Sequence, residues 1–400
     1  MKHKPKDIQY CERLFQSFYE IGSTPQGGVT RLGYTETEDA MHEVFKGLGR
    51  ELGASVITDE VGNTYVTNTD EDGYTLIGSH LDSVIEGGRY DGVAGVMAGL
   101  MVMRWAKEDG IRIPLRVGAF RCEESSNFGC CTIGSGLITH EVYKQDIGHL
   151  MSKDGESLES IFEHRGLTLH PKKISGLRRY LELHIEQGGV LEAERMQIGV
   201  VDGIVGIVRY RMTVSGCANH AGSTPMHLRD DALVKACRII TQLMERTEAA
   251  SPDMVCTVGT LQVFPGAVNV IPGKVEFIVE LRNPTMEPMD QVIDSVLKEH
   301  PELVGEEYIR QSPTQCSSKL IKLSETLCRN RGIRFRRMFS GAGHDLMNWG
   351  KAVPSMLLFI PSKDGISHSI REYSAPEDLY QGAELLMEMV QALDQEEGKL

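Results

Sequence analysis

One segment of the chain, GSHLDSVIEGGRYDG, has histidine and aspartate residues at the spacing of a metal site. His80 and Asp82 are two residues apart, so in an extended strand both side chains point the same way and Asp82 can orient the ring of His80. The glycine pair that follows allows a tight turn, which brings Asp91 back beside them, where one carboxylate can bridge two cations. The segment predicts a divalent-metal site, although a structural histidine and a helix N-cap would also explain these residues.

Two adjacent acidic residues in FRCEESSNFG follow a predicted strand. Glu123 and Glu124 come at its carboxyl end, where open α/β sheets bind ligands. Because consecutive residues of an extended chain face opposite ways, Glu124 can ligate a metal while Glu123 acts as general base towards water. Two solvated surface glutamates are the alternative explanation.

Two further histidines complete the set of candidate ligands. His184 lies in LELHIEQGG and His368 in DGISHS, each close to a predicted strand. Three imidazoles and two carboxylates form a nitrogen and oxygen set that suits zinc best, with manganese or cobalt as alternatives, and no thiolate is needed. The convergence of these residues beside strand ends of one domain predicts a single site.

Short apolar runs predict the strands that position these residues. They are Tyr74 to Ser79, Leu115 to Arg121, Tyr180 to Ile185 and Pro354 to Ile360. Between the first two, the stretch Gly92 to Lys107 is rich in Ala, Met and Leu and predicts a helix. This order of strand, helix and strand predicts an α/β fold with a mostly parallel sheet flanked by helices.

The middle of the chain has a different order of predicted strands and helices. Its order of elements, β-α-β-β-α-β, is the ferredoxin-like pattern. The elements are Ile207 to Ser215, Asp230 to Thr247, Val255 to Val263, Lys274 to Arg282, Met289 to Glu299 and Tyr308 to Ser312. Because strand signals resume at Ile333, we expect 207–313 to be an inserted α+β domain, and 1–206 with 314–400 to form one discontinuous catalytic domain.

Composition excludes several classes of protein. Hydrophobic residues at 41% and charged residues at 24% are typical of a folded globular chain, and a net charge of −14 argues against a nucleic-acid partner. The opening MKHKPKDIQYCERLF lacks the apolar core of a signal peptide, and no run of about 18 apolar residues predicts a membrane span. The nine cysteines contain no C-x-x-C pair, so we expect reduced thiols and a cytoplasmic protein.

With these motifs, the chain resembles the family of N-carbamoyl-L-amino acid amidohydrolases, allantoate amidohydrolases and β-ureidopropionases, within the dinuclear-metal aminoacylases and carboxypeptidases. The segments that carry the resemblance are GSHLDSVIEGGRYDG, ELHIEQGGVLE, NHAGSTPM, NVIPG and SGAGHD. It implies two divalent ions per subunit: His80, Asp91 and His184 hold one, and Asp91, Glu124 and His368 hold the other. It also implies that Glu123 is the general base.

The same resemblance makes the inserted domain a dimerisation and lid unit, so it implies a homodimer. It implies that the substrate is a small carboxylated ureido compound, hydrolysed to an amino acid, carbon dioxide and ammonia. His220 would stabilise the oxyanion, reaching across the dimer, and Arg282 would bind the carboxylate bidentately. The expected substrate-binding residues are Gln187, His220, Asn269, Arg282, Gly341 and His344.

Two positions depart from the family pattern, and three other functions stay open. Asn127 stands where relatives often carry arginine and Gly266 where they often carry asparagine, so the substrate pocket is expected to differ. An N-acyl amino acid hydrolase or dipeptidase could use the same metal pair. A nucleotide-binding oxidoreductase is disfavoured because the glycines after Asp91 do not form G-x-G-x-x-G. The third alternative is a metal-bearing binding protein without activity.

Overall fold

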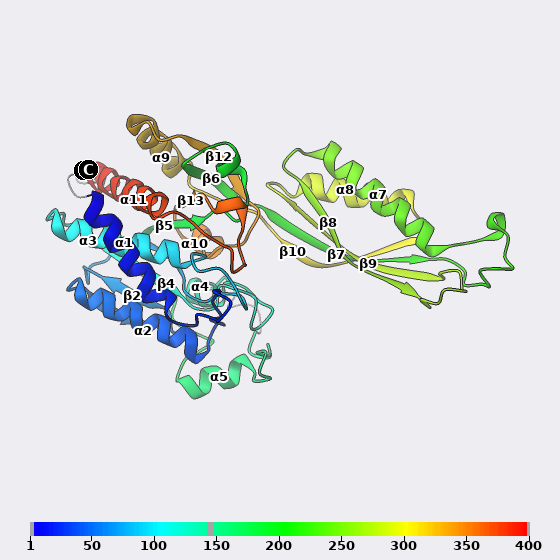
Figure 1. The fold of residues 1–400 in the computed structure, drawn as a ribbon, viewed down its shortest axis with the longest axis horizontal. Coiled ribbons are helices and arrows are strands. Elements are labelled where there is room, and N and C mark those ends of the chain that lie inside the picture. The colour runs from blue at the N-terminus through cyan, green and yellow to red at the C-terminus, as the bar shows by residue number, and fades with distance from the viewer. Residues whose placement is uncertain (1–3, 142–146, 398–400) are drawn as a thin grey trace. The chain divides into compact units, whose positions relative to one another are not determined.

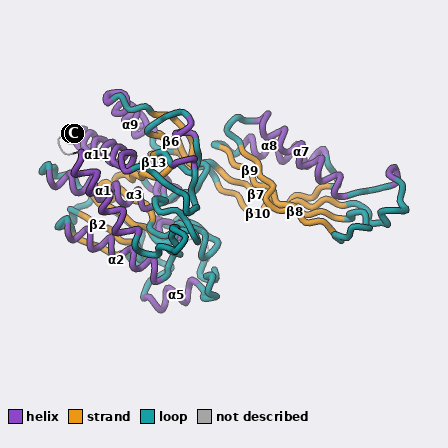
Figure 2. Tube along the Cα trace, viewed as in Figure 1, coloured by secondary structure: helices purple, strands orange, loops and turns teal. Residues whose placement is uncertain are grey.

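The computed structural model describes residues 4–141 and 147–397, which form two compact units (Figure 1). The first comprises residues 1–202, 315–338 and 342–400, and the second comprises 203–314 and 339–341. The sequence of the second unit therefore lies largely between two parts of the first. Figure 2 shows that both units combine helices with strands.

A nine-stranded sheet forms the centre of the first unit. Its order is β1-β2-β4-β3-β5-β13-β6-β11, and β12 pairs with β6. The four central strands β4, β3, β5 and β13 are parallel, whereas β1, β2 and β6 pair antiparallel with their neighbours. The strands are β1 (Ser55–Thr58), β2 (Thr64–Thr67), β3 (Tyr74–His80), β4 (Leu115–Phe120), β5 (Leu177–Ile185), β6 (Ile198–Ile204), β11 (Thr314–Gln315), β12 (Phe335–Ser340) and β13 (Ser355–Ile360).

Burial explains why these segments form parallel strands. Every residue of β3 and β13 is buried, as expected for strands covered on both faces, which read as continuous apolar runs. The predicted α/β class with a parallel sheet is confirmed. The short strands β1 and β2 were not predicted, because four-residue segments carry too little periodicity to detect.

Helices cover both faces of this sheet. In β5, Tyr180 lies against Trp349 of α10, with ring centroids 5.6 Å apart, whereas Leu183 lies close to Gly382 of α11. Residues three apart in a strand face opposite ways, so α10 and α11 pack on opposite faces. The helices of this unit are α1 (Lys4–Tyr19), α2 (Glu36–Glu51), α3 (Val93–Glu108), α4 (Ile133–Thr139), α5 (Leu158–Arg165), α6 (Val190–Ala193), α9 (Ser318–Arg331), α10 (Leu346–Ala352) and α11 (Pro376–Glu397).

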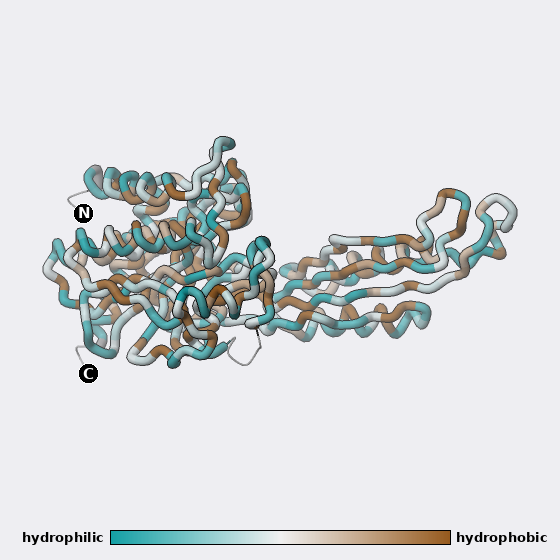
Figure 3. The backbone as a smooth tube through the Cα atoms, turned by 90° about the horizontal axis from the view of Figure 1, so that it is seen from below, coloured by the Kyte–Doolittle hydropathy of each residue, from teal (hydrophilic) through white to brown (hydrophobic). Residues whose placement is uncertain are grey.

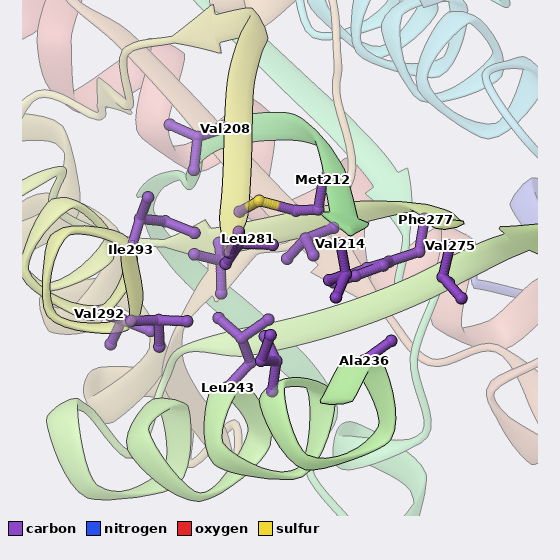
Figure 4. Close-up of a cluster of buried hydrophobic side chains, with 14 of the residues drawn as sticks. Val208, Met212, Val214, Ala236, Leu243, Val275, Phe277, Leu281, Val292 and Ile293 are labelled. Carbon is purple, nitrogen blue, oxygen red and sulfur yellow. The ribbon is translucent and has the colours of Figure 1, made fainter. Parts of the chain in front are cut away.

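The second unit is a four-stranded antiparallel sheet with two helices. Its strand order is β10-β7-β9-β8, and residues of α7 and α8 join those of the sheet in one hydrophobic core (Figure 4). Figure 3 shows hydrophobic and hydrophilic residues alternating along these strands, the pattern of a sheet with one covered face. The elements are β7 (Gly206–Ser215), α7 (Ala232–Ala250), β8 (Val255–Phe264), β9 (Lys274–Asn283), α8 (Glu287–Glu299) and β10 (Leu303–Gln311).

Two elements are defined by their ends. The last strand of the second unit begins at Leu303, earlier than the predicted Tyr308. The final helix α11 ends at Glu397, the last of the described residues. None of the helices in the described part of the chain has the length and apolar character needed to cross a bilayer.

Candidate metal centre and active site

The carboxyl ends of the parallel strands bring the candidate ligands to one edge of the sheet. His80 is the last residue of β3 and is in register with Phe120, the last residue of β4. His184 is the penultimate residue of β5 and is in register with Phe359 of β13. The loops that carry the other ligands leave this same edge, which is the usual ligand-binding edge of an open α/β sheet.

Asp91, just before α3, meets two of the histidines through one carboxylate oxygen. Its Oδ1 lies 3.0 Å from Nε2 of His184 and 3.6 Å from Nε2 of His80. All three side chains are buried. The three donor atoms lie close enough together to hold one ion.

The second oxygen of Asp91 belongs to another group of possible ligands. Its Oδ2 lies 3.1 Å from Nε2 of His368, and the same ring nitrogen lies 3.1 Å from Oε1 of Glu124. His368 adopts a left-handed backbone conformation, with φ of 52°, which is uncommon for a residue with a side chain. Asp91 is therefore shared by two groups of three possible ligands.

These residues fit a pair of divalent cations. Around a tetrahedral zinc ion, with bonds of about 2.0–2.1 Å, the ligand atoms lie roughly 3.3 Å apart, close to the separations seen here. The outer nitrogens of two of the histidines are occupied: Nδ1 of His184 lies 3.0 Å from the carbonyl of Ile185, and Nδ1 of His80 lies 3.2 Å from the carbonyl of Asp82. Such bonds fix the tautomer and direct Nε2 towards the centre.

The members of this cluster shift one another's pKa values. Burial acts to raise the pKa of the Asp91 carboxyl, but hydrogen bonds with His184, His368 and His80 outweigh it and hold this pKa well below its ordinary value. Hydrogen bonds with Asp91 and Glu124 raise the pKa of His368 to about 10. Because an imidazole must lose its proton to ligate a metal, cation binding here releases protons.

Glu123 faces the same centre. Its Oε2 lies 3.8 Å from Nε2 of His80, and burial, together with the neighbouring Glu124, raises the pKa of its carboxyl well above the ordinary value. The expectation of an extended chain at this pair was wrong. Cys122 has φ of 51°, which turns the backbone after β4, so both glutamates face the centre instead of lying on opposite sides of a strand.

Asp82 has a larger structural role than orienting one ring. Its Oδ1 lies 3.3 Å from Nδ1 of His80, as the spacing suggested. Its two carboxylate oxygens also accept hydrogen bonds from the backbone N–H groups of Glu123 and Glu124, both at 3.0 Å. One buried carboxylate thus fixes a candidate ligand and the loop that carries the candidate base.

The role of Glu372 was not predicted from the sequence. Its carboxylate is buried and accepts hydrogen bonds from the backbone N–H groups of Tyr90, at 2.7 Å, and Asp91, at 3.1 Å. The hydroxyl of Ser367 lies 3.1 Å from this carboxylate and 2.9 Å from Oδ2 of Asp91. Glu372 therefore ties the Asp91 loop to the His368 loop, and no local pattern signals this, because its partners are backbone groups far away in the chain.

Gly92 is required by close packing. It has φ of +66°, and a Cβ atom there would lie 2.5 Å from the ring of His80. Its backbone N–H lies 3.3 Å from Nε2 of His184. Only glycine allows α3 to begin this close to the candidate ligands His80 and His184.

Four of the expected substrate residues lie in the second unit, namely His220, Asn269, Arg282 and Gly341. His220 accepts hydrogen bonds at Nδ1 from the N–H groups of Gly222 and Ser223, both at 3.1 Å, so its Nε2 carries the proton and can donate. Asn269 is exposed. The guanidinium of Arg282 pairs with Glu280 at 2.7 Å and donates to the carbonyl of Gly341.

The other two expected substrate residues lie in the first unit. Nε2 of Gln187 is 3.1 Å from Oδ2 of Asp91, and its buried Oε1 has no hydrogen-bond partner in the described residues. His344 is buried against His184, with ring centroids 4.5 Å apart, so it contacts a candidate ligand. Asn127 is buried and bridges the carbonyl of Gly33 to the N–H of Lys153, which is a structural role.

The chain is similar to known proteins over nearly its whole length. Residues 76–392 match the model described as Peptidase family M20/M25/M40. The chain is 36% identical to N-carbamoyl-L-amino acid amidohydrolase of Geobacillus stearothermophilus, over 96% of this chain and 99% of that protein. It is 32% identical to allantoate amidohydrolase of Bacillus subtilis (strain 168), over 96% of each chain. A crystal structure of an amidase of the hydantoinase/carbamoylase family from Burkholderia multivorans matches with a TM-score of 0.88 at 31% identity, over 96% of this chain and 97% of the other.

Proposed function

Because this chain belongs to peptidase family M20/M25/M40 and is a metal-dependent amidohydrolase of that family, we propose that it hydrolyses the ureido C–N bond of an N-carbamoyl-L-amino acid. The relative with 36% identity carries the name of this reaction and is matched over 99% of its length. The observation that carries the proposal is the buried Asp91, shared by two groups of ligands beside the carboxyl of Glu123. Allantoate is the alternative substrate, because allantoate amidohydrolases are similar over the same length.

Five residues would hold two divalent cations, for which zinc suits the donor set best. His80, Asp91 and His184 would ligate one, and Asp91, Glu124 and His368 the other. Bound cations supply Lewis acidity, which polarises a carbonyl and makes water easier to deprotonate.

Glu123 supplies the base. Its carboxylate accepts a proton from the water that attacks the ureido carbon, and it then delivers that proton to the amino nitrogen as the C–N bond breaks. Asp82 holds the backbone of Glu123 in place during both transfers. The products are the free amino acid and carbamate, which decomposes to carbon dioxide and ammonia.

The substrate would be held by its carboxylate and its carbonyl oxygen. Arg282 has a planar guanidinium that can pair with the α-carboxylate, and Asn269 and Gln187 offer hydrogen bonds to the same end. His220 has a free donor at Nε2 for the oxyanion that forms at the ureido carbon. The first unit would thus perform the chemistry, and residues of the second would recognise the substrate.

Ammonia release tests this function. The protein is stripped of metal, reloaded with zinc, manganese or cobalt, and offered N-carbamoyl-L-amino acids, N-carbamoyl-β-alanine and allantoate. We expect metal-dependent ammonia from one of these classes. If none of them releases ammonia but N-acyl amino acids or dipeptides are cleaved, the chain is an N-acyl amino acid hydrolase or dipeptidase. If no substrate is cleaved, a binding protein without activity is favoured.

The base has its own test. Glu123→Gln removes the proton acceptor but no ligand, so we expect full metal content and a fall in kcat of about 10²–10⁴-fold. Glu71→Gln, at an exposed loop position, is the matched control and should keep wild-type activity. Wild-type kcat in Glu123→Gln would remove Glu123 from this role.

The chain would act as a homodimer through β8. This edge strand exposes Val255, Leu261 and Phe264, and Val268 just beyond it is fully exposed. An uncovered edge with apolar side chains is prone to pair with another strand, and a second copy of the same strand would cover it symmetrically.

The chain would work in the cytoplasm. All nine cysteines are free thiols, and five of them lie exposed or partly exposed. Such thiols persist in a reducing compartment.

A further inference from the structure

A cavity of about 470 Å³ in the first unit shares two residues with the metal centre. His368 and Gln187 line it, together with Ser367, Ser369 and Arg371. Small-molecule sites commonly have volumes of about 300–1,000 Å³, so an amino acid derivative fits this space. A molecule in the cavity lies against a candidate metal ligand.

The lining of this cavity is cationic. It includes no carboxylate, in a chain whose 56 acidic residues outnumber its 42 lysines and arginines. The guanidinium of Arg371 makes no ion pair or hydrogen bond with any residue in the described ranges. By contrast, Arg121 pairs with Glu38, and Arg282 pairs with Glu280.

Apart from His368, a candidate metal ligand, the remaining polar side chains of the lining are neutral and already oriented. Gln187 donates to Asp91, and its Nε2 lies 3.4 Å from Nε2 of His368, so the orientation of its side chain is fixed by these two contacts. The hydroxyl of Ser369 lies 3.3 Å from the backbone N–H of Arg371 and that of Ser367 is bound to Asp91 and Glu372. Arg371 is therefore the one lining group with a permanent charge and several unused donors.

We propose that Arg371 binds a second carboxylate on the substrate, so that the preferred substrates are N-carbamoyl derivatives of acidic amino acids. The inference rests on the proposed function, in which the ureido group meets the metal centre and Arg282 takes the α-carboxylate. The planar guanidinium pairs bidentately with a carboxylate of the amino acid side chain. A neutral side chain leaves Arg371 without a partner, and this difference gives specificity.

Pairs of substrates with the same shape isolate the effect of the negative charge on the side chain of the substrate. kcat/KM is measured on zinc-loaded protein for N-carbamoyl-L-aspartate against N-carbamoyl-L-asparagine, and for the glutamate and glutamine pair. Hydrogen bonds to charged groups suggest a preference of about 10- to 100-fold for the acidic member of a pair. Arg371→Gln should abolish this preference by lowering kcat/KM for the acidic member of each pair, and Arg371→Lys should keep part of it. Arg112→Gln, at an exposed position before β4, is the matched control.

Equal kcat/KM for the acidic and neutral members in the wild type overturns the inference, as does an equal loss on both members in Arg371→Gln. Absence of ammonia from every ureido substrate contradicts the proposed function instead. In that case calorimetric binding of N-carbamoyl-L-aspartate still tests Arg371. Affinity that is weaker in Arg371→Gln than in Arg112→Gln supports the inference, and equal affinity overturns it.

Discussion

Asp91 contacts three histidines through its two carboxylate oxygens, and its position depends on residues that ligate nothing. The types and spacing of the histidines and acidic residues predict a metal centre from the sequence, and the structure brings these residues together. They were not enough to find Glu372, because a glutamate that accepts hydrogen bonds from distant backbone N–H groups has the same local pattern as an exposed one. The chemistry that a side chain can perform can be inferred from its residue type. A side chain that holds a distant backbone segment in place can be identified only once the fold is known.

Replacement of Glu372 tests this support. Removal of its carboxylate in Glu372→Ala leaves the N–H groups of Tyr90 and Asp91 without acceptors, so the carboxylate of Asp91 loses its fixed position. We expect metal affinity to fall by about 10- to 100-fold, measured by competition with a chelator. Glu372→Gln keeps an acceptor oxygen and should lose less.

The control for this change is Glu377→Ala, an exposed position in the first turn of α11. Its metal affinity should equal that of the wild type. If Glu372→Ala also retains wild-type affinity, Glu372 does not position Asp91.

At the scale of elements, the sequence predicts those strands and helices whose burial leaves a recognisable pattern of apolar residues. The central strands β3, β4, β5 and β13 are short, mostly buried runs and were predicted with ends close to those observed. The turn at Cys122 was not foreseen, because a left-handed residue without glycine gives no sequence signal. That turn decides where both glutamates point, so the geometry of the candidate base depends on the fold of a single loop.

The helix α2 supplies a test of stability against pH. His42 is buried, its Nδ1 lies 2.9 Å from the hydroxyl of Thr64, and burial, with Arg121 and Lys46 nearby, holds its pKa well below 6.5. The folded state keeps the ring neutral while the unfolded chain binds a proton below 6.5, so stability falls as pH falls through that value. The loss approaches about 1.4 kcal/mol per pH unit for one proton.

The comparison is with His42→Gln, which cannot take up this proton. Urea unfolding is measured from pH 8 to pH 5 for both proteins. We expect the free-energy difference between the wild type and the variant to be constant above pH 7 and to shift against the wild type below about 6.5. A difference that stays constant over the whole range would show that His42 is not held neutral.

At the scale of the whole molecule, the order of elements predicts an inserted domain at 207–313, and the second compact unit of the structure comprises 203–314 and 339–341. Residues 339–341, at the end of β12, join the second unit although they follow it by 25 positions in the chain. A boundary of this kind depends on spatial contacts, which a local pattern does not contain.

The proposed dimer is also tested at this scale. Leu261 on β8 is 43% exposed, and Val304 on β10, the opposite edge strand, is 65% exposed. Leu261→Glu places a charge in the proposed interface, so we expect it to shift the protein towards monomer in sedimentation velocity. Val304→Glu is the matched control and should remain dimeric. A monomeric wild type, or equal behaviour of the two variants, contradicts an interface at β8.

Metal titration tests the central claim most directly. Metal-free protein receives zinc in steps, and the rate of ammonia release from its best ureido substrate is followed against equivalents added. Two groups of ligands that share Asp91 predict a rate that rises up to two equivalents per chain and then stays constant. Activity that is complete at one equivalent, or that is present without metal, would contradict the account.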